Sequence, residues 1–241
     1  MLKQLDEILL SDNAREMFYQ NYQNQEFKNW ILSILPEIEL CKNQKQDNPW
    51  HIYDCLDHIL HSVEEMNNQT RYMDFETRKM LAYTMFLHDI GKPQCYFRRY
   101  SNLYGRYVDS FFNHNLVSEK IAERVLPKLE FNKKQSNIIC LLVKEHDLFM
   151  NLTLEDDGNK YHIVLTQQYL DKLFKKFNVF CDGKKLLNFL VMVGRADNLA
   201  QNPKMTKESL KKIDIFENML KKERAKNEID FLKTWLFQVF F

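Results

Sequence analysis

The sequence has little of what interrupts helices and no thiol pattern typical of a metal site. Among its 241 residues are only five glycines and five prolines, the residues that mark turns and loops, so the composition favours helices. Its cysteines are odd in number and never in CxxC spacing: Cys41, Cys55, Cys95, Cys140 and Cys181. Such scattered cysteines predict free thiols in a reducing, cytoplasmic compartment.

The sequence also lacks a dominant charge and long apolar runs. Lys and Arg number 34 against 33 Asp and Glu, which leaves a formal net charge of +1. This balance gives no support for broad attraction to nucleic acids or to membrane surfaces. No apolar stretch reaches the length that spans a bilayer, and the segment 1–11 carries Asp6 and Glu7, unlike a signal peptide. We therefore expect a cytoplasmic protein without a membrane partner.

What the chain does contain is apolar residues in helical spacing. Hydrophobic residues make up 45% of it, including 18 Phe, which is enough to build a core. From Ile52 to Met66, an apolar residue recurs at every helical turn. The sequence therefore predicts an all-α fold. Other segments with helical patterns are 2–10, 26–35, 77–89, 116–129, 134–146, 167–177, 184–200 and 207–235.

Few segments depart from this helical pattern. The stretch 42–49 is polar and reads as a loop, and the stretch 94–112 is aromatic and basic with Gly105 near its middle, which indicates a hairpin or lid. No linker is visible, so we expect a single helical domain over 1–241. Within it we expect an N-terminal helical extension at 1–45, a core at 46–203 and C-terminal helices at 204–241.

One predicted buried segment ends on two polar side chains. The residues from Met80 onward are nearly all apolar, yet the run finishes with His88 and Asp89 side by side. A lone histidine on an apolar face is usually a core residue bonded to a backbone carbonyl, and a lone inward Asp is more often a cap or half of an ion pair. At a helix end, however, adjacent His and Asp side chains can both turn onto one cation.

Several other polar side chains repeat this inward placement. Asp197 continues the apolar stripe of Leu190 and Val193, where an unpaired carboxylate would cost several kcal/mol. His61 falls on the opposite side of its helix and is expected to face water. Imidazoles and carboxylates without thiolates suit an open site for one or two divalent ions, such as Fe, Mn, Mg, Ni or Zn. The candidate ligands are His58, His88, Asp89, His114, His146 and Asp197.

In this order along the chain, the residues resemble the signature of the HD-domain superfamily of metal-dependent phosphohydrolases. That signature is a histidine on one helix, a His-Asp pair on the next and a distant Asp. The run from about 35 to 203 is most similar to the C-terminal HD domain of bacterial CCA-adding tRNA nucleotidyltransferases. The stretches that carry the resemblance are 57-DHILHSV-63, 88-HDIGKP-93, 112-FNHNLVSEKIAERVL-126, 144-KEHD-147 and 195-RADNLAQNP-203.

The resemblance has two departures. The nucleotidyltransferase head is absent, so the chain is not expected to add nucleotides, and Asn113 stands where the family usually has Gly. The resemblance implies an HD-type helical bundle, bound divalent metal and hydrolysis of a phosphate ester. It assigns the first ion to His58, His88, Asp89 and Asp197, and a second ion to His114 and His146 with Asp89 as the bridge.

Our leading hypothesis from the sequence is a phosphomonoesterase or phosphodiesterase that acts on a nucleotide or nucleotide-like substrate. Asp89 and Lys92 are the catalytic candidates: Asp89 can bridge two ions, and Lys92 is placed to neutralise a phosphate oxygen. A Lys at a helix C-terminus is also stabilised by the helix dipole. A hairpin that only packs its own aromatic residues is favoured over a lid that contacts substrate as the explanation of 94–112. The candidates for substrate binding are Lys92, Arg98, Arg99 and Arg195.

Two other hypotheses remain open at this point. The chain can be a non-catalytic RNA- or tRNA-binding HD module with a vestigial metal site, although RNA contacts usually need a basic face and the net charge is nearly neutral. Alternatively, the metal only holds the fold together, although six donors exceed what a four-coordinate structural site requires. The expected partner is a small phosphate ester, and the very apolar stretch 231–241 either docks on the core or forms a homodimer interface.

Overall fold

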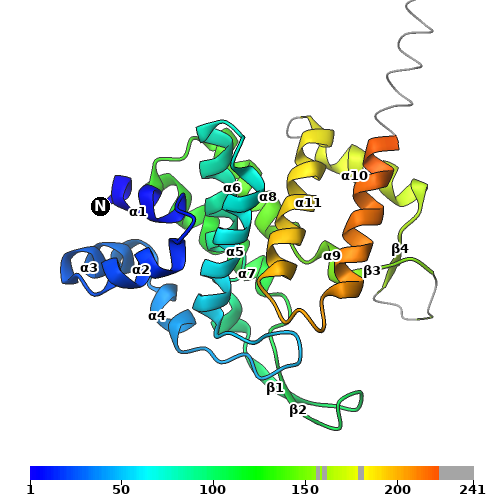
Figure 1. The fold of residues 1–241 in the computed structure, drawn as a ribbon, viewed down its shortest axis with the longest axis horizontal. Coiled ribbons are helices and arrows are strands. Elements are labelled where there is room, and N and C mark those ends of the chain that lie inside the picture. Colours follow the sequence, from blue (N-terminus) through cyan, green and yellow to red (C-terminus); the bar gives the residue numbers. More distant parts are fainter. Residues whose placement is uncertain (156–157, 159–161, 179–181, 223–241) are drawn as a thin grey trace, which may run out of the picture.

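The computed structural model is described here for residues 1–155, 158, 162–178 and 182–222. In this part of the chain the structure is a bundle of helices with two short strand pairs, which confirms the predicted all-α class (Figure 1). None of its helices combines the length and the apolarity that crossing a membrane requires. Cys181 and the apolar stretch 231–241 lie outside the described residues.

Most elements follow one another along the chain with short connections, and the segment 43–54 between α4 and α5 is longer. The first four helices, α1 to α4, lie together on the left of Figure 1, and a further helical segment at 207–222 lies beside α11. The helices are α1 (Leu2–Leu9), α2 (Ala14–Tyr22), α3 (Gln25–Ile34), α4 (Glu37–Lys42), α5 (Cys55–Thr70), α6 (Phe75–Leu87), α7 (His114–Val125), α8 (Lys133–Glu145), α9 (Leu148–Asn151), α10 (Gln167–Phe177) and α11 (Gly183–Leu199), with 3-10 turns η1 (Lys92–Cys95) and η2 (Leu126–Leu129).

Helix α6 is the centre of the bundle. Its residues from Met80 to Leu87 are all buried, because α5, α8, α11 and α1 surround it. Because neighbouring helices surround this part of α6, no face of it contacts water. This explains the nearly continuous apolar run seen in the sequence. The residues that follow, His88 to Ile90, are buried as well, so the chain leaves α6 without leaving the interior.

Helix α5 begins later than its apolar pattern suggested. The pattern started at Ile52, but α5 starts at Cys55 and Ile52 lies exposed ahead of it. The side chain of Asp54 accepts a hydrogen bond from the Asp57 N–H at 2.9 Å, which fixes the first turn as an N-cap does. The cap fixes the residue at which α5 begins, and with this start the His58 side chain points into the bundle.

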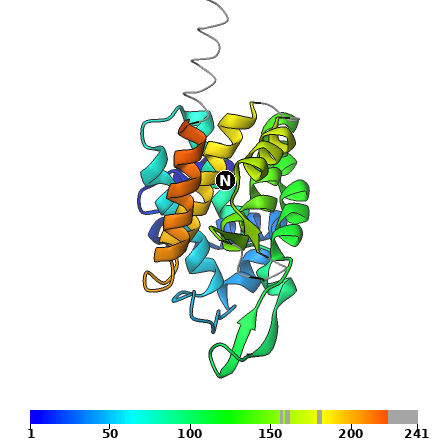
Figure 2. The same cartoon turned by 90° about the vertical axis from the view of Figure 1, so that its right-hand side faces the viewer.

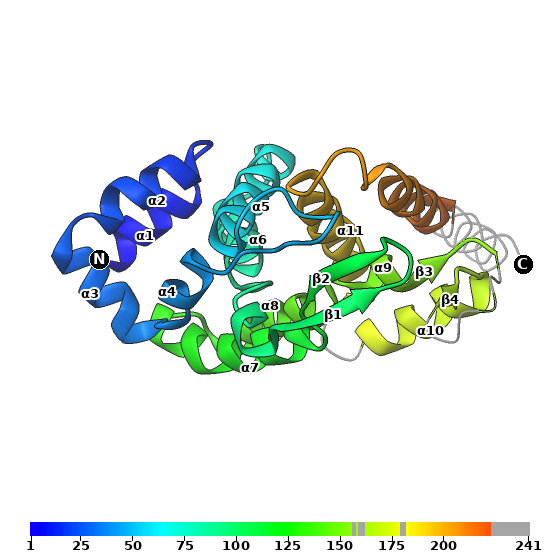
Figure 3. The ribbon, with the colours of Figure 1, turned by 90° about the horizontal axis from the view of Figure 1, so that it is seen from below.

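The aromatic and basic insert forms the hairpin that was one of its two expected forms. Strands β1 (Phe97–Ser101) and β2 (Arg106–Ser110) pair antiparallel, and Gly105 near the tip has a φ of +61°, a left-handed conformation that favours glycine. The hairpin projects from one end of the bundle (Figure 2), beside the long connection between α4 and α5 (Figure 3). A second, parallel pair joins β3 (Leu152–Thr153) to β4 (Ile163–Val164).

Backbone and side-chain bonds fix the hairpin to the connection between α4 and α5. The Asp109 N–H donates to the Asp47 carbonyl at 2.9 Å, and the Asp47 N–H donates to the Asp109 carboxylate at 2.7 Å. The guanidinium groups of Arg98 and Arg106 also donate to the Asp47 carboxylate, at 2.8 and 2.7 Å. The hairpin is therefore a fixed wall in this structure.

We expect the start of α8, which carries His146 at its far end, to depend on its N-cap. Asn132 and Gln135 form a reciprocal capping box, so Asn132→Ala should lower the free energy of unfolding by about 1 kcal/mol. Urea denaturation measures this loss. The control is Asn68→Ala, an exposed position within α5, where the better helix propensity of Ala should leave stability unchanged or slightly higher. Equal losses in both variants would contradict the role of the cap.

Candidate metal centre

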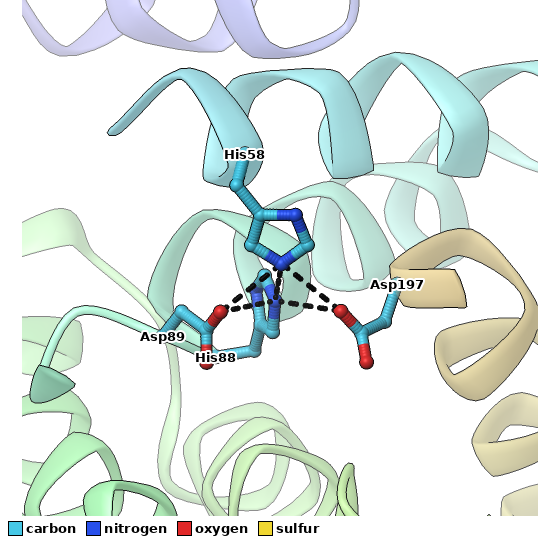
Figure 4. Close-up of side chains that lie close together, drawn as sticks. All are labelled: His58, His88, Asp89 and Asp197. Carbon is cyan, nitrogen blue, oxygen red and sulfur yellow. Dashed lines mark hydrogen bonds and ion pairs between the residues drawn. The ribbon is translucent and has the colours of Figure 1, made fainter. Parts of the chain in front are cut away.

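Four polar side chains from three parts of the bundle meet in its interior (Figure 4). His58 comes from α5, Asp197 from α11, and His88 and Asp89 from the segment directly after α6. All four are buried, and their ligand atoms lie within 4.8 Å of one another. The His58 Nε2 atom is 3.1 Å from Asp89 Oδ2, 3.0 Å from Asp197 Oδ1 and 3.3 Å from His88 Nε2.

A second group shares one of these residues. The Asp89 Oδ1 atom lies 3.0 Å from His114 Nε2 and 3.4 Å from His146 Nε2, and the two imidazole nitrogens are 3.1 Å apart. His114 is the first residue of α7 and His146 follows the last residue of α8. The two oxygens of Asp89 therefore face two different groups of imidazoles, so the carboxylate can bridge two ions. The structure brings together all six of the predicted ligands.

The orientation of each imidazole is set by a backbone carbonyl. A carbonyl oxygen only accepts hydrogen bonds, so the ring nitrogen that contacts it must carry a proton. The Nε2 atom is then directed into the cluster, where it can carry a second proton or bind a metal ion. The Nδ1 atoms of the four histidines contact carbonyl oxygens as follows: His58 with Ala200 at 3.2 Å, His88 with Met85 at 2.6 Å, His114 with Phe111 at 2.8 Å and His146 with Val143 at 2.7 Å.

This geometry requires a positive charge at the centre of each group. Without one, neutral imidazoles would direct Nε2 lone pairs at each other and at the carboxylate oxygens. Asp89 Oδ1 is a buried oxygen without a hydrogen-bond donor in the described part of the chain. Either protons on the imidazoles or metal ions between the ligands can supply the charge. Nitrogen and oxygen ligands of this kind suit a divalent metal, so the residues present fit such an ion.

The carboxylates stay ionised in spite of their burial. Burial alone would raise the pKa of Asp89, but the charges of His88 and Lys92 hold it well below its usual value. Burial likewise acts to raise the pKa of Asp197, and hydrogen bonds from His58 and His88 outweigh that effect. For His88, burial lowers the pKa, whereas Asp89 and Asp197 raise it to about 10 overall. Two buried negative charges thus attract a cation to the centre.

Lys92 lies within the site, and its hydrogen-bonding capacity is already used. Its ammonium group is 2.5 Å from Asp89 Oδ2, 2.9 Å from Gln46 Oε1 and 3.1 Å from His51 Nε2. An ammonium has three N–H donors, so these three acceptors saturate it. Lys92 therefore offsets part of the charge of Asp89 here, and its contact with a phosphate oxygen remains a prediction.

Two further residues belong to the site but were not singled out from the sequence. The carboxylate of Asp147 is 3.4 Å from both His114 Nε2 and His146 Nε2, so it lies beside the second group without belonging to it. Its position directly after His146 repeats the His-Asp adjacency of His88 and Asp89, and this was the signal available. The helical spacing places His51 on the same margin of the apolar stripe as His58, but His51 was not predicted as a site residue. It lies ahead of α5, and its Nε2 contacts Lys92.

A cavity of about 440 Å³ opens onto the second group of ligands. This volume is within the range of small-ligand pockets, about 300–1,000 Å³. Asp89, Lys92 and Asp197 lie at its wall, whereas His58 and His88 are buried beneath it. Other residues that line it include Trp50, Arg99, Tyr104, Phe112, His114, His146 and Asp147.

The predicted substrate-binding arginines have different surroundings. Arg99 lines the cavity, but Arg98 and Arg195 are not among its lining residues in the described part of the chain. Arg98 donates to Asp47 on the outer side of the hairpin. Arg195 donates to Asp214 and Glu217 at 2.7 and 2.8 Å, which ties α11 to the helical segment 207–222.

The residue before His114 adopts a conformation that glycine would favour. Asn113 has a φ of +63°, in the left-handed region where Asn is better tolerated than most side chains. An asparagine before His114 is therefore compatible with the placement of this histidine at the start of α7. His61 is partly buried, stacks on Tyr53 and pairs with Glu64 at 3.3 Å, outside the cluster.

A comparison of the chain with protein-family models finds no match. The functional interpretation of the cluster therefore depends on its geometry: two groups of buried ligands, one shared carboxylate and a cavity beside them.

We expect two divalent ions per chain. After removal of metal by a chelator, titration with Mn²⁺ in a calorimeter should show two sites. Asp197→Asn should weaken the first and His146→Asn the second, each by more than about 100-fold, because loss of even an outer hydrogen-bond partner of a ligand costs about 10–100-fold. His61→Asn, a histidine outside the cluster, is the matched control. A single site that is unaffected by His146→Asn would contradict the second group.

We also expect Gly91 to control the position of His114. A Cβ atom at Gly91 would lie 2.7 Å from the Ser118 nitrogen and 2.8 Å from the His114 carbonyl oxygen, so Gly91→Ala must displace the start of α7. The same titration should show weaker binding of the second ion. Gly105→Ala is the control, because its Cβ meets nothing within 4 Å and the hairpin tip carries no ligand. Unchanged metal binding by Gly91→Ala would rule out this coupling.

Proposed function

We propose that this chain is a metal-dependent phosphohydrolase of the HD-domain superfamily that acts on a nucleotide or nucleotide-like phosphate ester. The observation that carries the proposal is the position of Asp89, whose two oxygens face two groups of imidazole nitrogens beside a cavity of small-ligand size. The order of these ligands along the chain agrees with the HD signature. A site for a structural ion would have no need of the cavity.

Two divalent ions, when bound, supply Lewis-acid polarisation of a phosphoryl oxygen and lower the pKa of a water molecule. The chain contributes the fixed positions of the ligands. Four carbonyl oxygens hold the imidazoles, and Gln201 donates to Asp197 Oδ1 at 3.0 Å. Because the ligands are oriented in advance, little reorganisation is needed when substrate binds.

Hydrolysis adds the oxygen of water to phosphorus and breaks the bond between phosphorus and the bridging oxygen. The proton that the water loses balances the charge of the departing group, which is an alcohol for an ester or a phosphate for a nucleoside diphosphate. Among the carboxylates of the cluster, Asp147 is the most exposed, with 22% of its side chain accessible. It lines the cavity, so we assign to its carboxylate the uptake of the proton that the attacking water loses. Asp89 and Asp197 are instead directed at the ligands around them.

Aromatic side chains of the cavity support a nucleotide as the substrate. Trp50 and Tyr104 line the same cavity as the ligands, and aromatic rings offer stacking surfaces to a base. The backbone at Trp50 is held in place, because its carbonyl accepts a hydrogen bond from the Asn202 N–H at 2.8 Å.

The RNA-binding alternative has less support. Of the hairpin's basic groups, Arg98 and Arg106 both pair with Asp47, which removes them from the free positive surface that RNA binding usually requires.

We expect the Mn²⁺-loaded protein to hydrolyse at least one class among nucleoside monophosphates, nucleoside diphosphates, cyclic nucleotides and dinucleoside polyphosphates. Asp89→Asn should abolish the activity because it removes a charge shared by both groups. Asp147→Asn should lower kcat by about 10²–10⁴-fold, the usual range for a proton-transfer residue, with metal content unchanged. His61→Asn should retain full activity. Inertness across the panel, with two ions confirmed by elemental analysis, would refute the proposed function.

A further inference from the structure

Arg99 is the basic side chain of the cavity whose terminal donors have no protein acceptor in the described part of the chain. Its Nε–H donates to Ser110 Oγ at 2.8 Å. By contrast, Lys92 is saturated by three acceptors, and Arg98 and Arg106 share the carboxylate of Asp47. The two Nη groups of Arg99 thus keep both their charge and their donors available.

The Arg99 guanidinium is nevertheless held in place. Its central carbon lies 5.3 Å from the centre of the Phe112 ring, which supports one face of the group, while Ser110 fixes its inner nitrogen. Both supports come from the hairpin and the residues just after it. Because the bond to Ser110 and the ring leave the outer edge of the guanidinium unused, a pair of parallel N–H donors remains for a ligand.

The carboxylates near the hairpin do not neutralise Arg99. Asp109, which also lines the cavity, accepts from the Asp47 N–H at 2.7 Å and from the Tyr96 hydroxyl at 3.4 Å. Its nearest guanidinium is that of Arg98, at 3.9 Å. A fixed guanidinium with a free edge and no carboxylate partner is suited to a phosphoryl group, which it can bind through two parallel hydrogen bonds.

Arg99 and the ligand cluster occupy different parts of one cavity. The ligands come from the buried end, where Asp89 is 1% exposed, and Arg99 comes from an exposed position on β1. A phosphoryl group at the ligand cluster therefore leaves Arg99 free for another anionic group of the same molecule.

We propose that Arg99 binds a second phosphoryl group of the substrate and thereby selects nucleotides that carry one phosphoryl group in addition to the group that is hydrolysed. Nucleoside diphosphates and nucleoside 3′,5′-bisphosphates are the simplest members of this class. The inference depends on the proposed function, because the first phosphoryl group is the one held at the ligand cluster.

The kinetic test compares substrates with one and two phosphoryl groups. With the Mn²⁺-loaded protein, kcat/KM is measured for p-nitrophenyl phosphate, AMP, ADP and adenosine 3′,5′-bisphosphate. The wild type should prefer at least one of the two-phosphoryl nucleotides over AMP by tenfold or more. Arg99→Gln should remove this preference by raising KM at least tenfold for that nucleotide, with kcat and the values for p-nitrophenyl phosphate nearly unchanged.

Two further variants separate the contribution of the paired guanidinium donors of Arg99 from that of its positive charge. Arg99→Lys keeps the charge but loses the paired donors, so it should recover only part of the preference. Arg71→Gln removes an equal charge from an exposed arginine that pairs weakly with Asp12 at 3.4 Å, and it should leave the preference intact. An equal loss in Arg71→Gln and Arg99→Gln would reduce the effect to net charge and overturn the inference.

A binding measurement distinguishes failure of the inference from failure of the proposed function. The probe is α,β-methylene-ADP, titrated calorimetrically into the metal-loaded wild type and Arg99→Gln. If α,β-methylene-ADP binds the wild type and Arg99→Gln weakens this binding at least tenfold, the second phosphoryl site is supported. This holds even if no substrate is hydrolysed, and only the proposed function then fails. If the protein hydrolyses these substrates and Arg99→Gln changes kcat/KM equally for AMP and for the two-phosphoryl nucleotides, the inference is overturned. It is also overturned if Arg99→Gln changes kcat/KM for neither. In both cases the proposed function stands.

Discussion

The buried carboxylate of Asp89 is the constraint on which the rest of the structure depends. A charge in this position is costly unless opposite charges and donors surround it, and the bundle places imidazoles on both sides of it and an ammonium group beside it. These partners come from α5, α7, α8 and η1, so the packing of four separate elements converges on one side chain. The same convergence directs imidazole nitrogens and carboxylate oxygens toward one another, so positive charge is needed between them.

Helix ends solve two problems at once in this site. The last carbonyls of an α-helix lack partners within the helix and need donors from elsewhere. His88 and His146 each follow the last residue of a helix, and each donates its Nδ1–H to the carbonyl three residues earlier, Met85 or Val143. The bond satisfies an unpaired carbonyl and also directs Nε2 into the cluster. A single local geometry thus ends the helix and orients the ligand, which explains how a histidine can follow the buried last turns of α6.

The sequence was most informative where polar residues interrupt a periodic apolar pattern. Such interruptions led to the six candidate ligands that the structure brings together, because a buried charge on an inward face has few explanations. Helical spacing carries no such signal for Asp147, which is partly exposed, and His51 precedes α5, so its spacing relative to the helix does not fix its position. The start of α5 was also missed, since the apolar pattern continues through Ile52 while the cap at Asp54 decides where the helix begins. The short helices α2, α4 and α9 and the pair β3–β4 were not predicted, since their patterns are brief and tertiary packing sets their conformation.

The arginines of the hairpin show why composition alone could not assign substrate contacts. Neighbouring side chains on a strand point to opposite faces, and Arg98 and Arg99 have different partners. Arg98 pairs with Asp47, whereas Arg99 bonds to Ser110 and lines the cavity. Which of them faces the cavity depends on how the hairpin sits against the connection between α4 and α5, and that placement is set by the bonds between Asp47 and Asp109. The near-zero net charge of the chain hides this division, since one arginine is neutralised by Asp47 while its neighbour keeps its charge at the cavity. Local pairing therefore decides where an anion can bind, and a cavity with acidic ligands at its buried end can still accept an anionic substrate at its exposed end.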